Sequence, residues 1–408
     1  MNKLRNISHI DCFSGPGGIA AGFRAAGIDT ALAIEKVKSC VDTYQYNHPQ
    51  VPVINKDIRF VENEDILAVI GDKKIDIVTA GFPCETFSTA GAKSRSFYDH
   101  RQFLYQEAIR VAVVVQADMV LFENVPAIRT KKAYKDQDIL IVSQIKSDLH
   151  QAGYVNLAEF VLNSYDYGVP QKRERYFIVA CKSKHVDLTQ TVHSKMSHKV
   201  CVAEAFSDLP LNKANSGEAK QYNDKVTSHF AQLMKNDAFW QLQKSEGLTY
   251  QVAPKHRDRT IARLKLLEQG EGLKDLFFKF PPDKVKQLQE DKILPKKWYI
   301  QRNRKLTAHQ PSMTVTSHCL DELVHPQLDR ALTVREVARL QSFPDCYQFV
   351  GGPMICPHMY ETQDKYEQVG DAVPPLLAYH WGIHLKKLLQ EVQNVNTSTS
   401  HSALLREV

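Results

Sequence analysis

Short apolar runs alternate with amphipathic stretches along the N-terminal part of the chain. Apolar runs typical of buried strands cover residues 6–14, 30–35, 51–58, 74–82 and 117–125. A helical period is found in residues 17–27, 103–116 and 139–153, the last of which ends at Gly153. Strands that alternate with helices predict a parallel β-sheet that is covered by helices on both faces.

The carboxyl ends of the strands, where such a sheet binds its ligands, carry unusual residues. The first strand is followed by "FSGPGG" (13–18), a glycine-rich turn whose main-chain amides can approach a ligand closely. The turn lacks the GxGxxG spacing and no Walker lysine follows it, so a phosphate cradle is disfavoured. The second strand ends on Glu35, which is placed to bond a ribose diol. Together these features favour S-adenosylmethionine over NAD as the cofactor.

The later strand ends add further polar and nucleophilic residues. Asp57 follows the third strand, Pro83–Cys84 follows the fourth, and Glu123–Asn124–Val125 ends the fifth. By itself, Cys84 fits a buried thiol, a metal ligand or a nucleophile. A carboxylate at a strand end is more often a cap or a surface charge than a catalytic group. Taken together, the residues at this edge favour a binding site.

Composition is that of a soluble globular protein, with 43% hydrophobic and 24% charged residues among 408. The apolar stretch among the first residues is too short for a signal peptide, and no later apolar run is long enough to span a membrane. We therefore expect a cytoplasmic protein with reduced thiols. The eight cysteines form no CxxC pair, and the spacing of Cys346, Cys356 and His358 fits no common zinc pattern. No metal is expected.

Positive charge is concentrated in one segment. Residues 251–310 hold 15 Lys and Arg against 7 Asp and Glu, a net charge of +8 in a chain whose total is +6. Such a segment is either a solvated surface or an electrostatic footprint for a polyanion. Charge alone favours neither.

Six longer motifs carry a resemblance to a known family. They are "DCFSGPGGIAAGF", "GFPCETFSTAG", "ENV", "YGVPQKRERYF", "RALTVREVARLQSFPD" and "VGDAVPPLLA". In this order they resemble the motif blocks of the DNA (cytosine-5)-methyltransferases, and they lie within residues 7–182 and 302–385. The unmatched stretch, about 183–301, falls where the family places its variable target-recognition region. Because the basic segment overlaps its second half, the resemblance favours DNA as the polyanion.

The chemistry of this family needs a thiolate, an acid and a cation, and the resemblance assigns them. Carbon 5 of cytosine is a poor nucleophile until a thiolate adds to carbon 6, which is the role implied for Cys84. A carboxylic acid at ring nitrogen 3 eases that addition, and Glu123 is the candidate. Arg175 would stabilise charge near O2, with Arg173 nearby on the same extended segment.

The resemblance also implies the cofactor site, which would bind S-adenosylmethionine and release S-adenosylhomocysteine without a metal. Its residues would be Phe13, Ser14, Gly15, Gly17, Gly18, Glu35, Asp57, Ile58, Pro83, Leu104, Asp371 and Ala372. Three residues depart from the family pattern. Glu85 replaces a usual glutamine after the cysteine, Asp371 replaces an asparagine, and Cys12 replaces a common leucine. None of them removes a chemically necessary group.

A cytosine inside a duplex must be extruded before it can react, so we expect double-stranded DNA to be the partner. The expected catalytic domain comprises residues 1–184 and 320–393, and it has a Rossmann-like α/β fold with a mostly parallel sheet. A smaller target-recognition domain is expected at 185–319, with a polar tail at 394–408. The helix around 372–391 should return to pack on the first domain, and residues 89–103 should form a loop that closes over DNA. Phosphate contacts are expected from Lys296, Lys297, Arg302 and Arg304.

The function implied is methyl transfer to carbon 5 of cytosine by a monomeric enzyme of the bacterial modification type, with any restriction endonuclease a separate protein. One alternative is a tRNA cytosine-5 methyltransferase of the same fold, although a long basic insertion suits duplex reading better. The other is a non-catalytic DNA-binding homologue, which should have lost one of Cys84, Glu123 or Arg175. All three are present.

Overall fold

The computed structural model describes residues 6–83, 100–190, 192, 198–223, 227–244, 247–357 and 361–404. The chain forms two compact units. The first comprises Met1–Asn163, Glu174–Lys195 and Pro375–Val408, and the second comprises Ser164–Arg173 and Met196–Pro374. The second unit therefore includes residues 320–374, which the sequence pattern groups with the catalytic domain. Of the expected target-recognition domain at 185–319, residues 185–195 belong to the first unit and 196–319 to the second, and its role stays a prediction.

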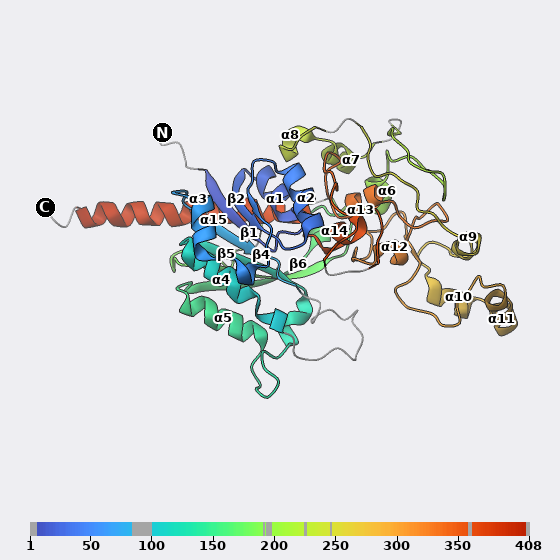
Figure 1. Ribbon diagram of the computed structural model, residues 1–408, viewed down its shortest axis with the longest axis horizontal. Helices are drawn as coiled ribbons and strands as arrows, with labels where there is room; N and C mark the ends of the chain where they lie inside the picture. The colour runs from blue at the N-terminus through green and yellow to red at the C-terminus, as the bar shows by residue number, and fades with distance from the viewer. Residues whose placement is uncertain are drawn as a thin grey trace. The chain divides into compact units, whose positions relative to one another are not determined.

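A seven-stranded sheet is the centre of the first unit (Figure 1). Its strands are β1 (Ile7–Cys12), β2 (Ile28–Ile34), β3 (Val53–Ile54), β4 (Ile77–Ala80), β5 (Met119–Asn124), β6 (Asn156–Asn163) and β7 (Glu174–Cys181), in the order β3-β2-β1-β4-β5-β7-β6. The first five strands are parallel, as expected from their apolar runs. β7 is antiparallel to both β5 and β6. The prediction of an α/β fold with a mostly parallel sheet is confirmed.

Helices cover both faces of this sheet (Figure 1). They are α1 (Gly18–Ala25), α2 (Lys38–Asn47), α3 (Asn63–Ile70), α4 (Tyr105–Val114), α5 (Ile141–Gln151) and α15 (Pro375–Leu404), with short 3-10 turns at Ile58–Phe60, His100–Phe103 and Pro126–Thr130. α3, α4 and α5 pack on one face through a cluster that includes Ile66, Ile109 and Ile145. On the other face, Trp381 of α15 packs against Phe160 and Phe177, with ring centroids 5.6 and 5.0 Å away.

The expected return of the C-terminal helix to the first unit is confirmed. A Cβ added to Gly22 of α1 would lie 2.3 Å from the oxygen of Pro375, and one added to Gly382 would lie 2.7 Å from Cβ of Ala26. Neither glycine has room for a side chain, because the two helices touch at their backbones. α15 begins at Pro375 and continues to Leu404, so the backbone of residues 394–404, expected as a polar tail, is helical. This stretch contains neither glycine nor proline to end the helix.

The second unit consists of short elements joined by long connections. They are the 3-10 turn Ser164–Tyr167, β8 (Arg304–Lys305), β9 (Leu323–Val324), α6 (Val202–Ala205), α7 (His229–Met234), α8 (Asp237–Trp240), α9 (Asp258–Lys265), α10 (Leu273–Lys279), α11 (Pro282–Glu290), α12 (Cys319–Glu322), α13 (Val334–Leu340) and α14 (Lys365–Asp371). A small leucine cluster packs α9, α10 and α11 together. Within the described residues, no helix is both long and apolar enough to cross a bilayer.

Buried ion pairs surround α13 in the second unit. Nη2 of Arg339 lies 2.6 Å from Oδ2 of Asp345, and its Nη1 lies 3.0 Å from Oδ1 of Asp208. Nη2 of Arg330 lies 2.7 Å from Oε1 of Glu336. All five side chains are at most 3% exposed. The charged residues of the motif "RALTVREVARLQSFPD" therefore form buried ion pairs that hold parts of this unit together.

Candidate active site

A strained turn joins β1 to α1 at the edge where ligands are expected. Phe13, Gly15 and Gly17 have φ angles of 56°, 53° and 99°, which lie in the left-handed region. The amide of Ser14 donates to the oxygen of Ile34 at 3.3 Å, and that of Gly17 donates to the oxygen of Ser14 at 3.1 Å. Glycine suits positions 15 and 17 because a side chain disfavours this backbone conformation, which Phe13 nevertheless adopts. The turn exposes main chain to a ligand at the head of β1.

Glu35 holds this turn to the end of β2. Its Oε2 accepts a hydrogen bond from the amide of Gly15 at 2.9 Å, and its Oε1 accepts one from Val37 at 2.8 Å. Burial raises the pKa of the carboxyl, and the amides of Val37 and Gly15 act in the opposite direction. Each carboxylate oxygen has a second lone pair, so Glu35 can also accept ribose hydroxyls. The side chain both shapes the turn and remains able to bind a diol.

Two buried oxygens at the head of β1 lack a hydrogen-bond partner among the described residues. They are Oγ of Ser14 and Oδ2 of Asp11. The other oxygen of Asp11 accepts from Thr79 at 2.9 Å, and burial raises the pKa of Asp11 to about 7. Buried polar atoms are normally paired, so these two atoms fit a site that is completed by a ligand. Asp11 was not predicted from the sequence, although a carboxylate within an apolar strand was a visible signal.

Three more residues predicted to bind the cofactor, Asp57, Ile58 and Leu104, lie in two places of the first unit. Asp57 caps the turn Ile58–Phe60 and is paired with Arg59 at 2.8 Å, which holds the pKa of Asp57 below its usual range. Ile58 and Leu104 are buried in the core cluster that packs α3 and α4 on the sheet. The side chain of Asp57 is partly exposed and could contact a ligand. Ile58 and Leu104 are buried and could contact it only through apolar atoms or the main chain.

The segment that leads to the expected nucleophile is anchored to β5. Residues 81–83 follow β4, and Nδ2 of Asn124 donates to the oxygen of Phe82 at 3.2 Å. The ring of Phe82 packs edge-on against Phe122, with centroids 5.8 Å apart. Cys84, Glu85 and residues 89–99 of the expected closing loop lie outside the described residues. The sequence places Asn124 in the strand end Glu123–Asn124–Val125 but predicts no role for it, and this contact gives it one.

Glu123 and Arg175 meet beside this segment. Nε of Arg175 lies 2.9 Å from Oε1 of Glu123, and the two side chains are 14% and 13% exposed. Glu123 pairs with Phe177 across the antiparallel strands β5 and β7, which makes Arg175 its diagonal neighbour on the same face. A Cβ added to Gly81 would lie 3.4 Å from Oε2 of Glu123. The carboxylate of Glu123 therefore lies next to Gly81, which follows β4 and precedes Cys84 by three residues in the sequence.

Three other predicted residues belong to the second unit. Arg173 is buried and donates to the main-chain oxygens of Val315 (2.6 Å), Gly370 (3.0 Å) and Ala372 (3.2 Å). Oδ2 of Asp371 accepts from Gln363 at 3.0 Å. The guanidinium of Arg173 therefore ties together main-chain segments, including the one that contains Asp371 and Ala372. Its expected catalytic role stays a prediction.

The four basic residues expected to bind DNA differ in their surroundings. Lys296 and Lys297 are exposed. Arg302 lies 3.1 Å from Asp321, and Arg304 lies 3.7 Å from Asp275. The two arginines are thus partly neutralised by acids of their own unit.

A group of potential metal ligands is present in the second unit. Cys356, Asp364 and Glu367 place one ligand atom each within 4.8 Å of one another. Both carboxylates already accept main-chain hydrogen bonds, because Asp364 and Glu367 form the capping box of α14. These contacts explain the cluster as a helix cap. Of the other residues considered for zinc, Cys346 is buried and His358 lies outside the described residues.

Known proteins similar in sequence cover nearly the whole chain. The family model of C-5 cytosine-specific DNA methylases matches residues 7–387. Type II methyltransferase M.DdeI of Desulfomicrobium norvegicum is 30% identical over 395 residues, which cover 95% of this chain and 91% of that protein. Type II methyltransferase M1.HphI of Haemophilus parahaemolyticus is 28% identical over 375 residues, covering 91% and 85%.

Solved structures share the fold. A protein described as a DNA modification methyltransferase encoded within an Escherichia coli prophage has a TM-score of 0.69 at 24% identity, covering 94% of this chain and all of that one. The methyltransferase EhMeth of Entamoeba histolytica has a TM-score of 0.55 at 12% identity, covering 94% and 99%. The chain belongs to the C-5 cytosine-specific DNA methylases and is a DNA (cytosine-5)-methyltransferase.

Proposed function

We propose that this enzyme transfers a methyl group from S-adenosylmethionine to carbon 5 of a cytosine flipped out of duplex DNA, through a covalent bond to Cys84. The observation that carries the proposal is the Glu123–Arg175 pair at the end of β4. An acid and a cation held together beside Gly81, three residues before Cys84 in the sequence, are the two groups that the cytosine ring requires. The similarity to two Type II methyltransferases supports a role as the modification enzyme of a restriction-modification system.

The proposed reaction begins at the thiolate. Cys84 adds its electron pair to carbon 6, and Glu123 supplies a proton or hydrogen bond to nitrogen 3 as electrons move into the ring. Arg175 orients Glu123 through their 2.9 Å contact and stabilises charge near O2. Carbon 5 would then form a bond to the methyl group as the bond between that group and the sulfonium sulfur breaks, which would leave S-adenosylhomocysteine. Loss of the proton from carbon 5 returns an electron pair that expels the thiolate and restores the aromatic ring.

The cofactor would be held by the turn after β1. Ser14 and Asp11 offer buried oxygens that lack partners among the described residues, and Glu35 offers lone pairs to the ribose. When bound, S-adenosylmethionine supplies a methyl group activated by a positively charged sulfur. Phe13, Gly15, Gly17, Gly18, Asp57, Ile58, Pro83 and Leu104 would form the rest of the site in the first unit. Asp371 and Ala372 of the second unit are cofactor residues by the family resemblance alone. Arg173 would act as a positioning residue for the segment that contains them.

Recognition of DNA is assigned to residues 185–319, of which 196–319 belong to the second unit. Its positive segment matches a polyanionic partner, and the loop 89–103 would close over the duplex after binding. We assign the enzyme to act as a monomer, with any endonuclease acting as a separate protein.

Methyl transfer to two kinds of nucleic acid tests the proposal. Purified protein is incubated with labelled S-adenosylmethionine and either unmethylated genomic duplex DNA or bulk tRNA. We expect label in DNA alone, and bisulfite mapping should place it at one cytosine within a short repeated sequence. Label only in tRNA would support the RNA alternative, and label in neither would support a non-catalytic homologue.

Glu35→Ala should weaken S-adenosylmethionine binding, because both the ribose contact and the support of the Gly15 and Val37 amides are removed. Loss of charge-assisted bonds of this kind costs about 1–3 kcal/mol, which is about a 5- to 150-fold rise in Kd. Isothermal titration calorimetry measures the change. Glu123→Gln is the matched control, which should keep cofactor affinity and slow methyl transfer. Equal affinity of Glu35→Ala and the unmodified protein would remove Glu35 from the site.

A further inference from the structure

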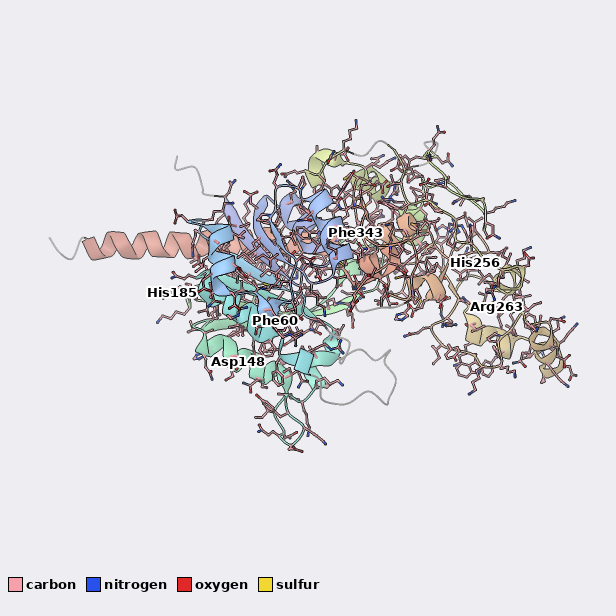
Figure 2. The ribbon with its side chains drawn as sticks, in the orientation of Figure 1. Phe60, Asp148, His185, His256, Arg263 and Phe343 are labelled. Atoms are coloured by element: carbon pink, nitrogen blue, oxygen red, sulfur yellow. The ribbon has the colours of Figure 1, made fainter. Side chains whose placement is uncertain are left out.

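A basic groove opens in the second unit beside α9. It has a volume of about 580 Å³ and lies between the start of α9 and the residues that follow α11. Arg263 and His256, both labelled in Figure 2, line it. Its basic lining residues are Lys255, Arg257, Arg259, Arg263, Lys292 and Lys296, and no carboxylate is among the lining residues. Of the six, only Lys296 was predicted from the sequence to contact DNA.

The positive charge of this groove is not neutralised within the described part of the chain. None of its six cations forms an ion pair with a described acid, whereas neighbouring cations outside the groove do. Lys279 contacts Glu268, Arg302 contacts Asp321, and Lys305 contacts Asp329. The basic segment therefore contains two kinds of cation: those paired with acids of the same unit, and those lining the groove, which have no ion pair with a described acid.

Arg263 is held in the groove at an electrostatic cost. Burial lowers its pKa, and the nearby charges of Arg302 and Arg259 lower it further, while Asp321 acts in the opposite direction. Its Nε is buried and lacks a hydrogen-bond partner among the described residues, and its Nη1 makes one long contact of 3.3 Å to the oxygen of Ile293. A guanidinium with unused donors in a positive groove is suited to a bound anion.

The first turn of α9 adds main-chain donors to this environment. The helix begins at Asp258 and its N-cap, Arg257, makes no side-chain cap hydrogen bond. Arg257, Arg259 and Thr260 of this turn line the groove. Positive helix N-termini favour anions, which reinforces the charge of the side chains. Asp258 in the same turn is exposed and is not part of the lining.

We propose that the groove between α9 and residues 289–296 is a phosphodiester site that anchors the DNA backbone during target recognition. This inference rests on the proposed function and assigns a contact surface to it. Phosphate contacts would set the register of the duplex on the second unit, while base contacts elsewhere would read the sequence. Arg302 and Arg304, which are paired with Asp321 and Asp275, would contribute less to DNA binding than the residues of the groove.

The salt dependence of binding to a non-specific duplex tests the site. Arg259→Gln/Lys292→Gln removes two exposed charges of the groove, and Lys284→Gln/Lys286→Gln removes two exposed charges of α11 that do not line it. Fluorescence anisotropy of a labelled duplex gives log K against log salt concentration. For the groove variant, we expect the slope to fall by about 0.9 for each phosphate that is no longer neutralised, and that of the control to be unchanged. Equal slopes for both variants would overturn the proposal.

Two further measurements distinguish a site for duplex phosphates from a site for free anions. Arg263→Met should lose affinity for the duplex, and Arg263→Lys should recover part of it because the charge is kept. Inorganic phosphate, tested by thermal shift against sodium chloride at matched ionic strength, should not stabilise the protein. Stabilisation that disappears in Arg263→Met would identify a site for free anions and overturn the assignment to DNA.

Methyl transfer distinguishes failure of this site from failure of the proposed function. At saturating duplex, Arg259→Gln/Lys292→Gln should transfer methyl groups as fast as the unmodified protein, with a higher KM for DNA. If the unmodified protein transfers no methyl group, the proposed function fails, and the salt slopes still decide whether the groove binds duplex phosphates. A lowered maximal rate with an unchanged KM would contradict an anchoring role.

Discussion

Cys84→Ser is expected to abolish methyl transfer and to prevent a covalent adduct with DNA that carries 5-fluorocytosine at the target. Fluorine at carbon 5 allows the methyl group to arrive but leaves no proton to remove, so the thiolate cannot be expelled. The unmodified enzyme should therefore remain bound to the duplex through denaturing electrophoresis, with the link at Cys84 in peptide mass spectrometry. A serine hydroxyl is far less ionised than a thiol near neutral pH and should form no such bond.

Other thiols supply the controls for this experiment. Cys201 is half-buried and lies at the N-cap of α6, where serine is a favourable replacement. Cys201→Ser should form the adduct as well as the unmodified protein does. Cys12 and Cys40 are buried, and burial raises the pKa of Cys12, so neither suits a nucleophile. An adduct at either residue, or one that persists in Cys84→Ser, would contradict the proposed mechanism.

Arg339→Met is expected to cause the largest loss of stability. The arginine is fully buried, and it donates two hydrogen bonds to Asp345 at 2.6 Å and one to Asp208 at 3.0 Å. Its removal takes away the cation that joins the two buried carboxylates, although Asp208 keeps Lys235 at 2.7 Å and Asp345 keeps Arg335 at 3.8 Å. Loss of one partner of a buried ion pair typically costs about 3–5 kcal/mol. Equilibrium unfolding in urea measures the change. Lys279→Met removes two surface ion pairs in the same unit, to Glu268 and Glu271, and should cost about 1 kcal/mol or less.

The neighbouring pair Arg330–Glu336 gives the network a pH dependence. Burial alone would raise the pKa of Glu336, but Arg330 beside it holds that pKa at about 2, below the ordinary value of 4.5. The ionised carboxylate of Glu336 therefore stabilises the folded protein fully above pH 4.5, and this contribution is lost as the pH falls towards 2. The difference in unfolding free energy between the unmodified protein and Glu336→Gln should shrink over this range. A difference independent of pH would show that the ion pair does not stabilise the unit.

Much of the first unit could be predicted from local sequence. Strands buried on both faces appear as continuous apolar runs, and amphipathic helices show their period, so β1, β2, β4 and β5 and the helices α1, α4 and α5 were each predicted near their observed positions. Because the carboxyl ends of parallel strands share one edge of a sheet, the sequence also predicts Glu35 beside the glycine turn, where its carboxylate accepts from Gly15. α2 was missed because its ten residues are mostly polar and carry a weak apolar stripe.

Contacts between residues that are far apart in the sequence were decided only by the tertiary structure. The antiparallel register of β5 and β7 brings Arg175 to Glu123, and no local pattern contains that register. Arg339 and Asp208 are 131 residues apart in sequence, so their pairing is visible only after folding. Lys and Arg residues of the basic segment have the same charge in the sequence, but folding supplies an acid to Arg302 and none among the described residues to Arg259. Sequence thus determined which chemical groups are present and their local conformation, whereas the fold determined which charges are neutralised, because electrostatic interaction depends on distance in space.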